Sequence, residues 1–287
     1  MLTLEEQNLS EKRPNAVDYE AVSGLHYLGN YERTLPTNMA RMMENAHDWE
    51  HLPFVHASSF TSIDLIHSGD WGWRAKLGLH GGAHQLLDLR VDNPGNYWVS
   101  AIYSGPGTGV EIHTQATTLN EDEIEVDVRF YLPEAPPDPA RSASLLARLS
   151  DQYRQLYDED IDLMSGRQSA LEDRARWQTG VEADNAVLVG DVTVLDRETP
   201  ISVETETGRF CVRFWKDSWI AHSAVCPHLL GPLSESEIDA DGAITCPWHG
   251  YRFDLETGDN LGGQCKALAS APRVEIREGY VYLVPMG

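Results

Sequence analysis

Residues 225–254 read V-C-P-H-L-L-G-P-L-S-E-S-E-I-D-A-D-G-A-I-T-C-P-W-H-G-Y-R-F-D and contain two pairs of metal-binding side chains. One residue separates Cys226 from His228, two separate Cys246 from His249, and seventeen residues lie between the pairs. A proline in each short spacer fixes φ and stiffens the loop, and a glycine after each pair permits a sharp turn. The pattern predicts two loops that hold one metal centre.

Two kinds of metal centre use two cysteines and two histidines. One is a two-iron two-sulfur cluster in which one iron takes both cysteines and the other takes both histidines. The other is a structural zinc site, but zinc fingers place cysteine with cysteine and histidine with histidine along the chain. Here each pair is mixed, and the second runs into G-Y-R-F-D, with aromatic residues at Tyr251 and Phe253. The ligand order therefore favours the iron–sulfur cluster over zinc.

This stretch resembles the Rieske ferredoxins and the Rieske non-haem iron oxygenases, and the resemblance covers about residues 181–287. The two cysteines and two histidines match the four cluster ligands of these proteins one by one. Rieske proteins of respiratory complexes carry an extra cysteine in each loop, where this chain has Gly231 and Trp248. The resemblance is thus to the lower-potential branch that delivers electrons to enzymes, within the range of about −150 to +300 mV open to such centres.

The composition describes an acidic chain of 287 residues with a formal net charge of −23. The length suits one large or two ordinary domains. With no basic face expected, nucleic acid is excluded as a partner. Cys211 and Cys265 remain outside the ligand pairs, and we expect free thiols, which fits a reduced, cytoplasmic location. No secretory signal and no apolar stretch of membrane-spanning length is visible.

The region before the cluster loops predicts an antiparallel sheet followed by a long helix. We expect a polar arm over residues 1–33 with a strand near 24–31, and then a helix that starts at Pro36 and is broken by Pro53. Alternating apolar residues predict further strands, with turn signals between them, at 62–67, 73–79, 85–91, 97–103, 110–118 and 124–132. After a proline-rich linker, a helix is expected over residues 142–176.

Asp160 interrupts the apolar stripe of this long helix, and a buried carboxylate is costly unless it is paired or bound to a metal. A sheet that grips a long C-terminal helix forms a cup with an apolar interior, and the helix would place Asp160 inside it. We therefore expect an α+β chain, with a helix-grip, START-like catalytic domain over residues 1–178. An all-β Rieske domain is expected over residues 179–287.

A second metal site is suggested by E-N-A-H-D-W-E-H-L-P-F-V-H, in which Glu44, Asp48 and His51 recur at helical spacing and His56 follows Pro53. The catalytic domain of Rieske oxygenases carries Asp-x-x-His-x-x-x-x-His, which fits Asp48, His51 and His56 at every spacing. A distant aspartate on a C-terminal helix completes that site, and Asp160 resembles it.

The resemblance implies mononuclear Fe(II) bound by His51, His56 and Asp160, a facial triad that leaves positions open for O2 and substrate. It also implies that Asp48 bridges a ligand histidine of this iron and a histidine of the cluster, and carries the electron route.

Several other side chains remain candidates. A lone His-x4-His is common by chance, so His51 could also be an ordinary surface histidine. If the register of the long helix differs, Asp158, Glu159 or Asp162 would take the place of Asp160. His47 lies off the Asp48 face and is not expected to be a ligand. His113 alternates within a strand and is a candidate substrate contact. His80 and His84, in H-G-G-A-H, form a second possible pair, but we expect them to be polar loop residues.

The resemblance implies an oxygenase that uses electrons from a separate NAD(P)H-dependent reductase, directly or through a ferredoxin. With O2 it would hydroxylate or oxidatively demethylate a small, partly apolar organic substrate. The chain has no G-x-G-x-x-G fingerprint, so the reductase is another protein. The domain order is the reverse of the family's. The resemblance therefore leaves open whether this chain assembles with the geometry of the family's head-to-tail trimers. The alternative is a non-catalytic Rieske electron carrier fused to a small-molecule-binding domain.

Overall fold

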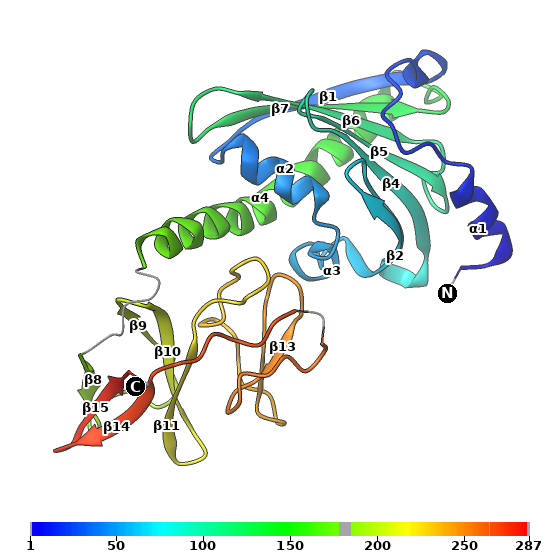
Figure 1. Ribbon diagram of the computed structural model, residues 1–287. Coiled ribbons are helices and arrows are strands. Elements are labelled where there is room, and N and C mark those ends of the chain that lie inside the picture. Colours follow the sequence, from blue (N-terminus) through cyan, green and yellow to red (C-terminus); the bar gives the residue numbers. More distant parts are fainter. Residues whose placement is uncertain (1, 178–184, 264, 286–287) are drawn as a thin grey trace. The chain divides into compact units, whose positions relative to one another are not determined.

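The computed structural model describes residues 2–177, 185–263 and 265–285. They belong to two compact units, Met1–Ser165 and Gly166–Gly287 (Figure 1). The helix α4, Pro139–Arg176, contributes residues to both units. The expected boundary between residues 178 and 179 lies outside the described residues.

The first unit is built on one seven-stranded antiparallel sheet in the order β1-β7-β6-β5-β4-β3-β2. Strands β2 to β7 pair with their neighbours in sequence, and β1 forms the far edge by pairing with β7. The predicted antiparallel sheet followed by a long helix is confirmed. The strands are β1 (His26–Leu35), β2 (Phe60–Gly69), β3 (Gly72–Leu79), β4 (His84–Asp92), β5 (Tyr97–Ser104), β6 (Glu111–Thr118) and β7 (Ile124–Leu132).

One face of this sheet is apolar because its strands alternate. In β7, Ile124, Val126, Val128 and Phe130 are fully buried, and each such side chain contributes roughly 1.5–3 kcal/mol to stability. The Tyr153 ring of α4 packs edge-on against Phe130, with centroids 5.4 Å apart. Figure 1 shows the first part of α4 crossing this face. The sheet and helix thus form the predicted cup.

The helix expected from Pro36 begins later in the structure. Leu35 still belongs to β1, and α2 covers Met39–His47. Its N-cap is Asn38, whose side chain accepts a hydrogen bond from the backbone N–H of Arg41 at 3.0 Å. A side-chain acceptor at the N-cap satisfies an N–H of the first turn that has no partner within the helix. The prediction of Pro36 as the first helical residue is therefore wrong.

The expectation that Glu44, Asp48 and His51 share one helix face is also wrong. Asp48 is the C-cap of α2 and has an extended backbone, with φ −83° and ψ 92°. A second, four-residue helix, α3 (Leu52–Val55), starts after it. Pro53 therefore lies in the first turn of α3, where its missing N–H costs nothing, rather than ending the preceding helix.

The opposite face of the sheet is covered by the N-terminal arm, which is more ordered than expected. Its helix α1 (Leu4–Glu11) begins with a capping box between Thr3 and Glu6. Behind it, the fully buried carboxylate of Asp88 accepts hydrogen bonds from Arg13 at 2.6 Å and from Arg74 at 2.5 Å. Two guanidinium groups thus compensate the buried charge, and one of them comes from the arm.

The second unit consists of the last turns of α4 and small antiparallel sheets. Their orders are β11-β10-β9, β12-β13 and β14-β15-β8. A core of Val203, Phe210, Val212, Trp219, Val281 and Leu283 joins the first and the third. The strands are β8 (Val187–Asp191), β9 (Ile201–Thr205), β10 (Gly208–Trp215), β11 (Ser218–Ser223), β12 (Ala243–Thr245), β13 (Arg252–Asp254), β14 (Arg273–Arg277) and β15 (Tyr280–Val284). The predicted α+β class with an all-β second part is confirmed.

Candidate metal centres

His51, His56 and Asp160 meet in the first unit. His51 is the N-cap of α3 and His56 its C-cap, so one short helix positions both imidazoles, while Asp160 comes from α4. The two Nε2 nitrogens lie 3.2 Å apart. Oδ1 of Asp160 lies 3.1 Å from Nε2 of His56 and 3.5 Å from Nε2 of His51. All three side chains are buried, with ligand atoms within 4.8 Å of one another.

A carboxylate stands behind each imidazole. Oε2 of Glu159 lies 2.7 Å from Nδ1 of His56, and Oδ2 of Asp48 lies 3.5 Å from Nδ1 of His51. With the proton held on each Nδ1, both Nε2 atoms present lone pairs toward the Asp160 carboxylate. Three electron-rich atoms at one buried point repel each other unless a proton or a metal cation lies between them. The donor set therefore fits a divalent metal ion, with carboxylates behind its histidines as is usual for metal-bound imidazoles.

His56 and Asp160 stabilise each other's charged forms. Burial raises the pKa of Asp160, but His56, His51 and the amide of Asn45 outweigh it, so the net direction is down. Burial lowers the pKa of His56, but the carboxylates of Asp160 and Glu159 outweigh it, so the net direction is up. Asp160 thus favours its ionised form, and metal binding would compete with the protonation of His56.

The neighbouring acidic residues of α4 do not enter the site. Asp158 is exposed and bonds Arg33, and Asp162 is exposed. Glu159 supports His56 instead of joining the three converging atoms, and its other oxygen accepts a hydrogen bond from Ser58 at 3.1 Å. The register of α4 therefore places Asp160, and not its acidic neighbours, beside the two histidines.

The remaining histidine candidates lie elsewhere. Nε2 of His47 contacts Asn93 at 3.2 Å on the surface. His80 contacts the carbonyl of Ala57, and His84 contacts Glu6. His113, the candidate substrate contact, does not line the cavity, because its side chain lies on the face of the sheet that the N-terminal arm covers. There its ring nitrogens lie 2.8 Å from the hydroxyl of Tyr97 and 3.0 Å from the carboxylate of Glu111.

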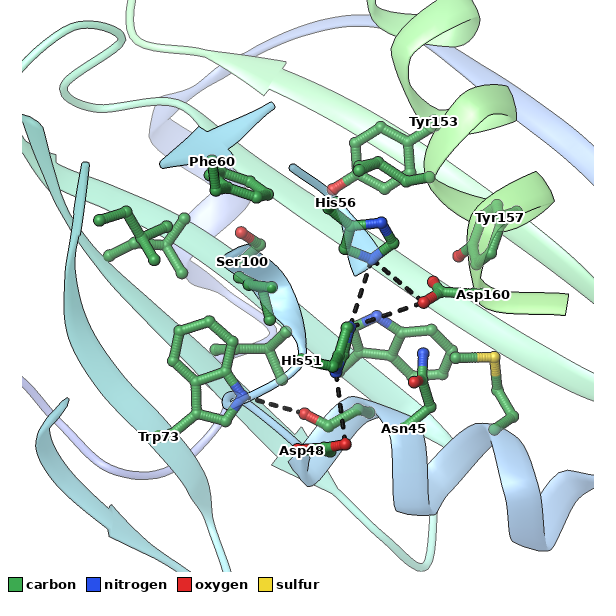
Figure 2. A pocket seen from close by; sticks show the side chains of 18 residues that line it. Asn45, Asp48, His51, His56, Phe60, Trp73, Ser100, Tyr153, Tyr157 and Asp160 are labelled. Atoms are coloured by element: carbon green, nitrogen blue, oxygen red, sulfur yellow. Dashed lines mark hydrogen bonds and ion pairs between the residues drawn. The ribbon is translucent and has the colours of Figure 1, made fainter. Parts of the chain in front are cut away.

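A cavity of about 130 Å³ adjoins the three converging side chains. Figure 2 shows His51, His56 and Asp160 at one side of it, with Trp73 and Phe60 on the opposite wall and Tyr153 of α4 nearby. Most of the wall is apolar or aromatic. Its remaining apolar and aromatic residues include Met42, Leu52, Leu77, Leu87, Leu89, Trp98, Leu156 and Tyr157. A small apolar molecule placed here would lie directly beside a metal on the triad.

The four cysteine and histidine ligands lie on two loops of the second unit. In the first loop, the Cys226 N–H donates to the Gly231 carbonyl at 2.9 Å. In the second, the Cys246 N–H donates to the Tyr251 carbonyl at 2.8 Å. The imidazoles of His228 and His249 meet edge-on, with ring centroids 4.5 Å apart. The two loops therefore bring the two candidate histidine ligands together.

The cysteines of these loops suit a cluster. Both are buried and free, not joined in a disulfide. The hydrogen bond with Cys226 and the nearby His249 lower the pKa of Cys246, and the same hydrogen bond raises the pKa of Cys226. Two buried thiols that share a proton, with two imidazoles beside them, fit the cysteine and histidine donors of a Rieske centre.

Residues 185–272 match the family model of the Rieske [2Fe-2S] domain. This part of the chain is therefore a Rieske [2Fe-2S] domain.

Two curated relatives match this part of the chain. The chain is 33% identical to flavonoid 8-hydroxylase 2, chloroplastic, of Ocimum basilicum over 104 residues, which is 35% of this chain and 18% of that protein. It is 36% identical to ferredoxin CarAc of Metapseudomonas resinovorans over 67 residues, which is 23% of this chain and 62% of that protein. The chain thus spans less than two thirds of either relative.

A solved structure resembles the other part of the chain. The Zhui aromatase/cyclase from Streptomyces sp. R1128 covers 51% of this chain and 98% of its own, at 10% identity and a TM-score of 0.43. No helix in the described part of the chain combines the length and the apolar composition that a membrane span needs.

Two site residues were missed or assigned another role from the sequence. Glu159 was considered only as a substitute ligand, yet it orients His56. Asn45 was not singled out, yet it is buried beside Asp160 and lines the cavity. Its place three residues before Asp48, on the α2 turn that leads into the site, is the one signal that points to it.

Proposed function

We propose that this protein is a Rieske-type non-haem iron oxygenase, with a catalytic domain over residues 1–178 and a Rieske domain over residues 179–287. His51, His56 and Asp160 would hold mononuclear Fe(II), and Cys226, His228, Cys246 and His249 would hold the [2Fe-2S] cluster. Electrons would come from a separate NAD(P)H-dependent reductase, directly or through a ferredoxin. The products would be hydroxylated or demethylated forms of a small, partly apolar molecule. We also propose a cytoplasmic location and a homo-oligomer, a trimer as in the resembling family.

The observation that carries this proposal is the convergence of both Nε2 atoms and the Asp160 carboxylate beside an apolar cavity. When bound by two histidines and one carboxylate, ferrous iron keeps positions open for O2 and substrate. Glu159 would hold the proton of His56 at Nδ1, so that its Nε2 is available to the metal. The apolar wall excludes water and places the substrate next to the triad. The similarity to flavonoid 8-hydroxylase 2, a protein named for hydroxylation, supports the same class of reaction.

The second candidate is an electron carrier without catalysis, which the similarity to ferredoxin CarAc favours. The exchange His51→Ala distinguishes the two. In an oxygenase, this variant loses the mononuclear iron and keeps the EPR signal of the reduced cluster, whereas a carrier keeps its iron content. The control is His47→Ala, four residues away on the surface, which should keep all iron. Equal iron content in both variants would contradict the proposed function.

The bridging role of Asp48 has its own test. Its carboxylate lies near Nδ1 of His51, and we propose that it also connects this histidine with the cluster. Asp48→Ala should keep both metal centres and reduce turnover sharply. Unchanged turnover with both centres loaded would exclude the bridging role.

A further inference from the structure

Outside the proposed metal ligands, Asn45 carries a polar atom of the cavity wall that has no hydrogen-bond partner. Asn45 is 7% exposed and lines the cavity. Among the residues that the structure describes, none forms a hydrogen bond with its Oδ1 atom. Its amide lies beside Asp160, and Figure 2 shows the side chain pointing from α2 toward Asp160 and His51. A buried acceptor without a partner destabilises the free protein and favours any ligand that donates to it.

The other polar groups of the wall have less need of a ligand. Ser100 and Tyr153 carry hydroxyl groups, which rotate and serve as donor or acceptor. The hydroxyl of Tyr157 interacts with Thr114. An amide oxygen is an acceptor only, so Asn45 sets which chemical group the site can accept.

The charge of the cavity wall and the cavity volume further limit the class of ligand that the site can bind. Among the described residues, the wall has no arginine or lysine, but it has the carboxylates of Asp48 and Asp160. No side chain would therefore compensate an anionic substrate. The volume of about 130 Å³ is close to that of an apolar cavity of roughly 150 Å³ that binds benzene in another protein. The aromatic wall, with Phe60, Trp73 and Trp98, suits edge-on or offset contacts with one ring.

We propose that Asn45 Oδ1 anchors the substrate by accepting a hydrogen bond from a hydroxyl or N–H group, and that the substrate is a neutral, single-ring aromatic molecule. This inference rests on the proposed function, because it gives the substrate class of the same site. Asn45 would determine specificity, holding the ring beside the metal in one orientation. A molecule without the donor would leave Oδ1 without a hydrogen bond. It would therefore bind more weakly than a molecule of equal apolar surface that carries the donor.

The test uses phenol, toluene and benzoate as probes. Toluene has the shape of phenol without the donor, and benzoate adds a charge. Affinities are measured by calorimetry on the cluster-containing protein with and without added Fe(II). The variants are Asn45→Leu, which is close in shape, and Asn45→Ala. Two further variants remove the competing hydroxyls, Ser100→Ala and Tyr153→Phe.

We expect both Asn45 variants to weaken phenol binding relative to toluene by about tenfold, the size of one net hydrogen bond. Ser100→Ala and Tyr153→Phe should keep the phenol-to-toluene ratio, and benzoate should bind weakest. The inference is overturned if the ratio is unchanged in both Asn45 variants, if a hydroxyl variant lowers it instead, or if benzoate binds best. It is also overturned if wild type binds none of the probes, or if phenol is preferred only with Fe(II) present.

The EPR signal of an iron–nitrosyl complex separates this inference from the proposed function. If wild type forms the nitrosyl signal but fails the phenol test, only the substrate class is wrong. If it forms no nitrosyl signal although phenol binds through Asn45, the ligand class stands and the oxygenase proposal fails.

Discussion

Glu159 and His56 form the shortest contact around the candidate iron site, with 2.7 Å between Oε2 and Nδ1. Glu159 directly precedes the proposed ligand Asp160 on α4, so one turn of this helix provides both a proposed ligand and the group that orients His56, the other proposed ligand. Ser58 and Gln155 donate to the other carboxylate oxygen, at 3.1 and 3.0 Å. The position of Glu159 is thus fixed from both sides.

We predict that Glu159→Ala lowers the affinity for Fe(II) by about 10–100-fold, the usual loss when the partner of a metal-bound histidine is removed. Glu159→Gln keeps an acceptor for Nδ1–H and should lose less. Affinity is measured by competition with a chelator, and cluster content by the absorption of the Rieske centre. The control is Asp158→Asn, on the exposed neighbour, which should bind Fe(II) like wild type. An equal loss in the control would show a general effect on α4.

Gly231 allows the two cluster loops to approach each other. A Cβ at this position would lie 2.8 Å from Sγ of Cys246, closer than real Cβ contacts, and 3.0 Å from the Trp248 ring, which is tighter than most of them. We predict that Gly231→Ala shifts the Cys246 loop and lowers cluster occupancy severalfold, as measured by acid-labile sulfide per chain. At Gly208, the nearest atom to a Cβ is a Phe210 carbon at 3.5 Å, so Gly208→Ala is the matched control. Full occupancy in Gly231→Ala would show that the loops are not as close as described.

Glu6 ties the N-terminal arm to the sheet and gives a pH-dependent contribution to stability. The backbone N–H of Thr3 and the ammonium of Lys76 lower the pKa of this buried carboxyl to about 2, against an ordinary value of 4.5. A carboxyl group whose pKa is lower in the folded than in the unfolded protein stabilises the fold at pH values above the unfolded pKa. For Glu6, this contribution is lost as pH falls from about 4.5 to about 2.

We predict that Glu6→Gln lowers the free energy of unfolding by about 1–3 kcal/mol at pH 7. Urea unfolding, followed by tryptophan fluorescence, measures the difference from wild type at each pH. The difference should shrink below pH 4.5, and the exposed neighbour Glu5 provides the control Glu5→Gln. A deficit that stays constant down to pH 2 would contradict this role of the charge.

The elements that follow from local patterns could be predicted from the sequence. The strand Ile124–Leu132 was found at its bounds, because one apolar face against a polar one repeats every second residue. Asp160 was predicted as a site residue because a carboxylate in an apolar helical stripe needs a partner, and the structure buries it beside His51 and His56. The cluster ligands were predicted from their order and spacing.

Other features depend on contacts that local patterns do not contain. Pro36 and Asn38 are both suitable helix-start residues, and Asn38 is the cap because β1 continues to Leu35 to pair with Ile124. Pro53 is compatible with the end of one helix or the start of the next. The contact between Glu159 and His56 joins residues 103 positions apart, so it appears only when α3 and α4 are in place.

The central claim is that this chain holds a mononuclear iron in addition to its Rieske cluster. The most direct test is the ratio of iron to acid-labile sulfide in protein purified without oxygen, followed by EPR of the reduced state with and without nitric oxide. The account predicts three irons to two sulfides, with a high-spin iron–nitrosyl signal beside the Rieske signal. Two irons to two sulfides, with no nitrosyl signal after Fe(II) is added, would contradict it.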